Sequence, residues 1–233
     1  MEPRPLTAAE ARRAVFIDFE GTRKDPPSLL GVYVAGKRPF RQYVIDPVLS
    51  AAAKYKSPRV AWRVKASGPV EALEELRRIV EPGGRRVFSW SKVERIEIAK
   101  LVAGRPGLAA FWAGRVEDAI PYAKAWKARA HPGVKLKTRP GRGRNTLENY
   151  EALIGLDRHA SHRWGNTGKR VREVKEALRK RGSMARLTRT QKGYWTNLLI
   201  HNENDCRGMA AVVAVIAGLV KPGKGVKRAF VLS

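Results

Sequence analysis

Acidic residues and cysteines are scarce in this chain. Its 233 residues include 21 Asp and Glu against 47 Lys and Arg, and they include a single cysteine, Cys206. One cysteine cannot form a disulfide within the chain, which excludes an internal disulfide framework. No apolar run reaches the roughly 18 residues that a transmembrane helix needs, and the apolar core of a secretory signal is also missing. We therefore expect a cytoplasmic protein that does not associate with a membrane.

The net charge of +26 exceeds what solubility requires and has the sign that attracts a phosphate backbone. The excess is concentrated in residues 121–192, where 20 Lys and Arg stand against 5 Asp and Glu, a net of +15. Because 43% of the chain is hydrophobic, it is not a disordered basic tail. Nucleic acid, either DNA or RNA, is the expected partner, ahead of an anionic membrane or a ribosome-like scaffold. Protein partners are left open.

Hydrophobic patterning predicts an α/β fold. Apolar runs of strand length at 14–19, 28–35 and 40–45 indicate a three-stranded meander, and a fourth strand is predicted at 86–90. Helical patterns cover 70–80, 92–102, 111–130, 146–155, 167–181 and about 187–220.

One compact domain over residues 1–233 is the simplest organisation for this length. Within it we expect a Gly/Pro-rich basic loop at about 131–145, because that stretch has little apolar content. A basic helical segment is predicted at about 167–192. These two segments carry much of the charge that would contact a phosphate backbone.

Two carboxylates lie two residues apart on the first predicted strand. Residues 16–22 read FIDFEGT, and because side chains alternate along a strand, Asp18 and Glu20 project from the same face. Two like charges on an apolar strand are costly unless a metal ion or an arginine neutralises them. Carboxylate oxygens suit Mg²⁺ or Mn²⁺, so this strand predicts a metal site.

A second pair of candidate residues lies near the other end of the chain. Residues 199–205 read LIHNEND, which places His201 and Asp205 four residues apart and therefore on one face of a helix. Taken alone, this spacing is more simply explained as an ordinary helical pair. Its combination with the acidic first strand makes it a candidate part of the same site.

Together, DFEGT at 18–22 and the His-x₃-Asp pair resemble motifs I and III of the DEDD exonuclease superfamily. The segment WSKVE at 90–94 resembles the second motif of a bacterial subgroup often labelled predicted RecB-family nucleases, with Glu where most members have Asp. VED at 116–118 and NTLENYEALIG at 145–155 look like the stretch between its motifs II and III, so the resemblance covers most of residues 14–215. It implies a ribonuclease-H-like mixed sheet, with a three-stranded antiparallel meander plus parallel strands, flanked by helices.

The resemblance implies that Asp18, Glu20, Glu94 and Asp205 are the catalytic, metal-binding carboxylates. Asp18, Glu20 and Asp205 would hold one Mg²⁺ or Mn²⁺ ion, and Asp18 with Glu94 would help to hold a second. His201 would orient or deprotonate the attacking water. It stands four residues before Asp205, where the tyrosine branch of the superfamily has Tyr, whereas the histidine branch has its His five residues before. The general base is therefore left open.

Several neighbouring residues have two interpretations. Glu97 lies on a similar helix face to Glu94 and is the weaker alternative for the third carboxylate. Asp118 is either an additional acid behind the metal ligands or a surface residue. Trp164 and Trp195, inside the basic region, would either stack on unpaired bases or pack in the core. Phosphate contacts are expected from Lys135, Lys137, Arg139, Arg142, Arg144, Lys169 and Arg170.

The function implied is that of a two-metal-ion-dependent nuclease that hydrolyses phosphodiester bonds of DNA or RNA, as a 3′ to 5′ exonuclease preferring single-stranded ends. Endonucleolytic or junction cleavage stays open, because only the substrate channel distinguishes these activities. The alternative is a catalytically inactive nucleic-acid-binding module, or a subunit of a larger nucleoprotein machine, with the same fold. A basic structural protein of a ribonucleoprotein would explain the charge but not Asp18 and Glu20 on one strand face.

Overall fold

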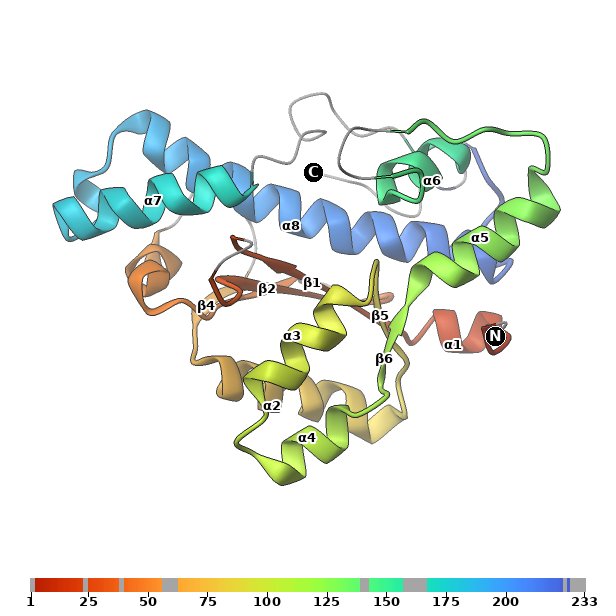
Figure 1. The fold of residues 1–233 in the computed structure, drawn as a ribbon, viewed down its shortest axis with the longest axis horizontal. Helices are drawn as coiled ribbons and strands as arrows, with labels where there is room; N and C mark the ends of the chain where they lie inside the picture. Colours follow the sequence, from red (N-terminus) through yellow and green to blue (C-terminus); the bar gives the residue numbers. More distant parts are fainter. Residues whose placement is uncertain are drawn as a thin grey trace.

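The computed structural model of the chain describes residues 3–22, 25–37, 40–55, 63–138, 143–156, 167–223 and 226. At its centre is a six-stranded mixed sheet in the order β4-β3-β2-β1-β5-β6 (Figure 1). The strands are β1 (Val15–Glu20), β2 (Leu29–Val34), β3 (Arg41–Val44), β4 (Arg63–Ala66), β5 (Val87–Ser89) and β6 (Val116–Asp118).

The strand pairing confirms the expected sheet. β1, β2 and β3 form an antiparallel meander, and β5 joins β1 in the parallel direction, followed by β6. β4 adds to the other edge, parallel to β3. This α/β arrangement is consistent with a ribonuclease-H-like fold. The two edge strands were not predicted, because segments of four and three residues are too short for a periodic pattern to identify.

Helices cover both faces of the sheet. The α-helices are α1 (Ala8–Ala11), α2 (Pro69–Val80), α3 (Val93–Leu101), α4 (Pro106–Trp112), α5 (Ala119–Ala130), α6 (Leu147–Leu153), α7 (Thr167–Arg181) and α8 (Arg189–Ile216). Short 3₁₀ helices are η1 (Pro47–Lys54), η2 (Glu81–Gly83) and η4 (Met184–Arg186). Figure 1 shows α8 running along one face of the sheet, where it contacts α5, α6 and α7, while α2, α3 and α4 lie on the opposite face. Within the described residues, no helix has the combined length and apolar composition that crossing a bilayer requires.

The prediction of a single helix over 111–130 is wrong. α4 ends at Trp112, and Gly114 adopts a left-handed backbone with φ of +72°, a conformation that breaks a helix and that glycine adopts without strain. The chain then forms β6 beside β5, and Asp118 caps the new helix α5 by accepting a hydrogen bond from the Ile120 amide at 2.8 Å. The helical periodicity therefore came from two helices separated by a strand.

The alternation of β1 fixes the direction of its acidic residues. Phe16 is buried in a cluster that includes Met209 and other apolar residues of α8. Val15 and Ile17 are buried on the opposite face, with residues of α2, α3 and α4. Because side chains at even-numbered positions of β1 share the face of Phe16, Asp18 and Glu20 must point toward α8.

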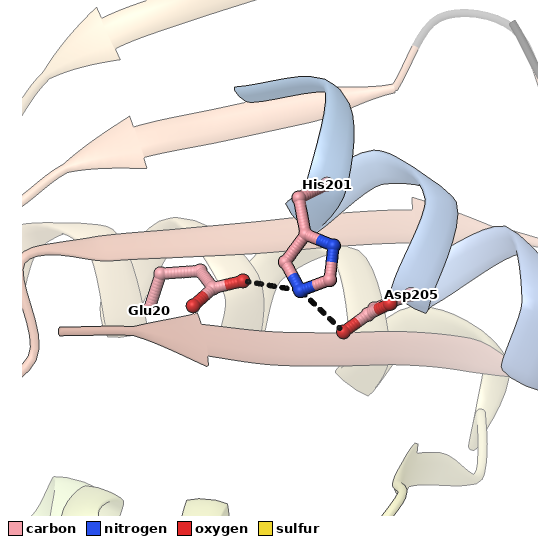
Figure 2. A group of neighbouring side chains, drawn as sticks. All are labelled: Glu20, His201 and Asp205. Carbon is pink, nitrogen blue, oxygen red and sulfur yellow. Dashed lines mark ion pairs between the residues drawn. The ribbon is translucent and has the colours of Figure 1, made fainter. Parts of the chain in front are cut away.

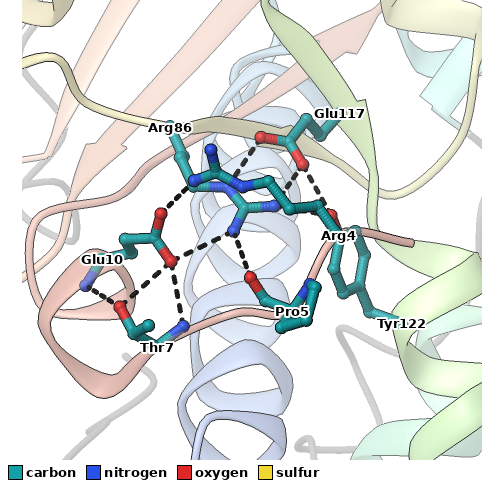
Figure 3. A network of polar contacts seen from close by, with 7 residues as sticks. All are labelled: Arg4, Pro5, Thr7, Glu10, Arg86, Glu117 and Tyr122. Atoms are coloured by element: carbon teal, nitrogen blue, oxygen red, sulfur yellow. Dashed lines mark hydrogen bonds and ion pairs between the residues drawn. The ribbon is translucent and has the colours of Figure 1, made fainter.

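A buried arginine ties the N-terminal segment to the sheet (Figure 3). Arg86 precedes β5, and its guanidinium is bidentate to the carboxylate of Glu117, with Nε 2.7 Å from Oε1. Nη2 also donates to the Tyr122 hydroxyl at 2.5 Å, and Nη1 lies 3.3 Å from both Glu10 Oε2 and the Pro5 carbonyl oxygen. The segment around α1 is therefore fixed against β5, β6 and α5 by one cation.

Candidate functional site

The structure brings β1 and α8 together around the imidazole of His201 (Figure 2). His201 Nε2 lies 3.7 Å from Glu20 Oε1 and 3.5 Å from Asp205 Oδ2. Glu20 and His201 are buried, with 6% and 8% of their surface exposed, and Asp205 is partly buried. Ligand atoms of these three residues all lie within 4.8 Å of one another, which is close enough for one metal ion to contact them together.

Glu94 reaches the site from α3, the helix that follows the neighbouring strand β5. β5 runs parallel to β1, and α3 begins four residues after β5 ends, so the first turn of α3 lies near the acidic end of β1. Glu94 is buried, and its Oε2 accepts a hydrogen bond from the Ser91 hydroxyl at 3.2 Å. Asp18, Glu20, Glu94, His201 and Asp205 all line one open cleft with a volume of about 860 Å³.

The structure distinguishes Glu94 from its alternative, Glu97. Both line the cleft, but Glu97 pairs with Lys100 on the outer part of the same helix, at 2.7 Å. Asp118 caps α5, and its charge adds to the effect of burial, which raises the pKa of Glu94. Ile120, the residue that Asp118 caps, lines the cleft, whereas Asp118 is not among the described residues that line it. Asp118 is therefore an acid behind Glu94 rather than part of the cleft wall.

The carboxylates of the cleft destabilise one another's charged forms. Burial raises the pKa of Glu20 to about 7, against the opposing effect of His201. Burial also raises the pKa of Glu94 to about 7. The pKa of Asp18 is raised well above its ordinary value by burial, and the charges of Glu20, Asp205 and Glu94 add to the effect. Oxygen donors crowded in this way fit a divalent cation, which would remove the repulsion.

Asn202 and Thr167 contact the acidic residues but were not identified from the sequence. The Asn202 amide donates from Nδ2 to the Asp18 carbonyl oxygen at 3.0 Å and to Asp18 Oδ2 at 2.8 Å. Thr167, the first residue of α7, lines the cleft beside Glu20, and its hydroxyl opposes the rise in the pKa of Glu20 that burial causes. Asn202 gave a faint signal, because it belongs to the polar run HNEND at 201–205, which interrupts an apolar stretch of α8. For Thr167 the sequence carries no signal.

One wall of the cleft is apolar. Trp90 is held there by a hydrogen bond from Nε1 to the Asn145 carbonyl oxygen at 3.0 Å, and its ring centroid lies 5.5 Å from that of Tyr150. Val93, which follows it on the cleft wall, is 52% exposed. The remaining apolar lining comes from Phe19, Pro27, Ile120, Leu147 and Met209. The cleft thus combines an acidic side with a side that suits a flat, apolar group.

Two groups of the expected phosphate contacts are exposed close to residues of the cleft. Arg144 directly precedes Asn145, which lines the cleft, and the Lys137 carbonyl oxygen accepts a hydrogen bond from Asn149 Nδ2 at 2.8 Å, on the helix whose first residue, Leu147, also lines it. Lys135 is exposed two residues before Lys137. Lys169 is exposed and Arg170 is partly exposed on the first turn of α7, next to Thr167, which also lines the cleft. Arg139, Arg142 and Trp164 lie outside the described residues. Trp195 is fully buried in the core between α7 and α8. Of its two interpretations, core packing is therefore confirmed and stacking on bases is wrong.

The five residues expected in the catalytic site therefore meet in one cleft, although they come from β1, α3 and α8. Neither a protein-family model nor a curated protein matches this chain. The reaction that the cleft supports is accordingly inferred from its own residues.

Proposed function

We propose that this protein is a nuclease that uses two divalent cations to hydrolyse phosphodiester bonds of DNA or RNA. The observation that carries the proposal is the convergence of Asp18, Glu20, Glu94 and Asp205, with His201, in one cleft of a protein whose net charge is +26. Nothing in the packing of the fold requires four acids there. A cation-assisted reaction on an anionic substrate accounts for both the acidic cleft and the basic remainder.

Asp18, Glu20 and Asp205 would hold one ion, and Asp18 together with Glu94 would help to hold the other. Their oxygens are the donors that Mg²⁺ and Mn²⁺ prefer. Bound there, such ions would lower the pKa of a water molecule and neutralise charge on the phosphodiester. The protein itself keeps the four carboxylates in place, because β1, α3 and α8 are all packed into the core.

His201 is proposed to receive the proton of the attacking water. Its Nε2 lines the cleft and lies between the carboxylates of Glu20 and Asp205. The carboxylates of Glu20 and Asp205 lie 3.7 and 3.5 Å from this nitrogen. His201 also lines the cleft that would admit the substrate.

The substrate is proposed to be a single-stranded end. The apolar wall formed by Trp90 and Val93 offers a surface to an unpaired base, and base stacking on an aromatic ring tolerates any sequence. Lys135, Lys137 and Lys169 are exposed close to residues of the cleft and suit contacts to the sugar-phosphate backbone. Cleavage in the 3′ to 5′ direction is proposed from the motif resemblance.

The proposal is tested by incubating end-labelled single- and double-stranded DNA and RNA with Mg²⁺, Mn²⁺ or EDTA. Wild-type protein is compared with Asp18→Asn, Asp205→Asn and Glu94→Gln. Glu97→Gln is the matched control, because it makes the same chemical change one turn away on the same helix. We expect a metal-dependent ladder of products that the first three variants lose and the control keeps.

Binding of nucleic acid without cleavage under every metal condition, unchanged by the substitutions, would overturn the enzyme and favour a binding module. Cleavage that Glu97→Gln abolishes and Glu94→Gln retains would instead reassign the third carboxylate.

A further inference from the structure

Asp18 belongs to a row of residues that crosses three strands. In the sheet register Asp18 pairs with Gly31 of β2, and Gly31 pairs with Gln42 of β3. Cross-strand partners project from the same face, so Asp18 and Gln42 both point toward α8, with a gap between them where Gly31 has no side chain. Asn202 of α8 lies over this gap, because a Cβ atom added at Gly31 would come within 2.2 Å of Asn202 Oδ1.

The hydrogen bonds of this row run in one direction. Gln42 Nε2 donates to the Leu199 carbonyl oxygen at 3.0 Å, which identifies the NH₂ group of Gln42, since a carbonyl only accepts. The same NH₂ group donates to Asn202 Oδ1 at 2.9 Å. Asn202 Nδ2 is therefore left to face the two oxygens of Asp18. The carbonyl of Leu199 thus sets the orientation of an amide that bonds an acidic residue of the cleft.

We infer that Asn202 is the positioning residue of Asp18, and that it fixes which carboxylate oxygen faces the cation site. The inference rests on the proposed function. Asn202 is fully buried and bonds Oδ2, so among the described residues Oδ1 is the freer oxygen of Asp18. An amide suits this task because it is neutral. A lysine or arginine at the same place would orient Asp18 as well, but it would also neutralise the charge that attracts a cation.

A purely structural role for Asn202 predicts different behaviour. If the amide only joins α8 to the sheet, its removal lowers the melting temperature, and the affinity for a cation stays the same. If it positions Asp18, the affinity for the cation falls even in protein that is still folded. Replacing a residue that hydrogen-bonds a metal ligand usually lowers metal affinity by about 10- to 100-fold.

The test is isothermal titration of the metal-free full chain with Mn²⁺, with the melting temperature measured in EDTA for each variant. Asn202→Ala is expected to weaken Mn²⁺ binding by about tenfold or more. Gly31→Ala is expected to weaken it as well, because the added Cβ displaces the Asn202 amide. When Asn202 is already Ala, Gly31→Ala should lower the Mn²⁺ affinity by less than about twofold, because the amide that the added Cβ displaces is no longer present.

Thr196→Ala is the matched control, because it removes another buried polar group of α8, one whose hydroxyl bonds only its own helix at Lys192 in the described structure. We expect it to leave Mn²⁺ affinity unchanged. Mn²⁺ affinity of Asn202→Ala within about twofold of wild type, or equal costs of Gly31→Ala in both backgrounds, would overturn the inference. Absence of Mn²⁺ binding in wild type, or binding insensitive to Asp18→Asn, would instead overturn the proposed function. If Asn202→Ala does not fold, Gly31→Ala alone decides the question by the same twofold criterion.

Discussion

His201 Nε2 and Asp205 Oδ2 lie 3.5 Å apart, one helical turn from each other on α8, and Glu20 Oε1 lies on the other side of the same nitrogen. This arrangement places the imidazole where it would either take up a proton or bind a cation. The two roles predict different properties for a variant that lacks the ring.

Replacement of His201 by Ala is expected to lower kcat by about 10²- to 10⁴-fold, the usual range for loss of a general base. Mn²⁺ affinity should change little, because the carboxylates of Glu20 and Asp205 remain. Single-turnover cleavage and Mn²⁺ titration measure the two effects separately. A large loss of Mn²⁺ affinity would contradict the proton-transfer role and make His201 a ligand.

Metal-free protein should lose stability as the pH rises toward neutrality. Burial raises the pKa of Glu20 and of Glu94 from 4.5 to about 7. Between these values the folded protein keeps protons that the unfolded chain has released, so the free energy of unfolding falls with increasing pH. In EDTA we expect a lower melting temperature at about pH 8 than at about pH 5, and greater stabilisation by Mn²⁺ at the higher pH. In the double variant Glu20→Gln/Glu94→Gln, the melting temperature in EDTA should differ less between about pH 5 and about pH 8.

Arg86 should contribute far more than Arg85 to the free energy of unfolding. Replacing Arg86 by Met removes the buried guanidinium that Glu117 and Glu10 share. Glu10 keeps its pair with Arg4, but the partly buried Glu117 loses its cation, which costs about 3 kcal/mol. Arg85→Met is the control, because within the described residues the hydrogen bond of the Arg85 guanidinium is to the Arg13 carbonyl oxygen, at an exposed position. Urea denaturation measures both, and equal midpoints for the two variants would show that the buried network contributes nothing.

Cations close to the cleft should contribute to nucleic-acid affinity and not to folding. Lys135→Gln/Lys137→Gln and Lys169→Gln are expected to weaken binding of single-stranded oligonucleotide and to reduce its salt dependence by about 0.7 per lost phosphate contact. Melting temperatures should not change, because all three side chains are exposed. Arg12→Gln, an exposed change at α1, serves as the control. An unchanged salt slope in the lysine variants would place the binding surface elsewhere.

The sequence was sufficient to predict the parts of the site that depend on local geometry. Alternation along β1 predicts that Asp18 and Glu20 share a face, and helical periodicity predicts the same for His201 and Asp205. The order β1, β2, β3 also followed, because the strands are consecutive and their apolar runs are distinct. That the two acidic strand residues point toward α8 followed only once the burial of Phe16 was known.

Other features depend on distant parts of the chain and have no local signal. Gln42 and Asn202 bond each other although 160 positions separate them, and their contact requires the register that places Gly31 between Asp18 and Gln42. The break at Gly114 was missed for a related reason. A glycine within a helical pattern is often tolerated, and only the pairing of β6 with β5 makes the break favourable.

The cleft is divided between the beginning and the end of the sequence, since Asp18 and Asn202 are 184 positions apart. During synthesis the ribosome releases β1 well before α8, so for most of that time Asp18 and Glu20 have no partners. A nascent chain therefore cannot assemble the cluster, and neither can a copy truncated before α8. The cluster therefore depends on synthesis of the chain through α8.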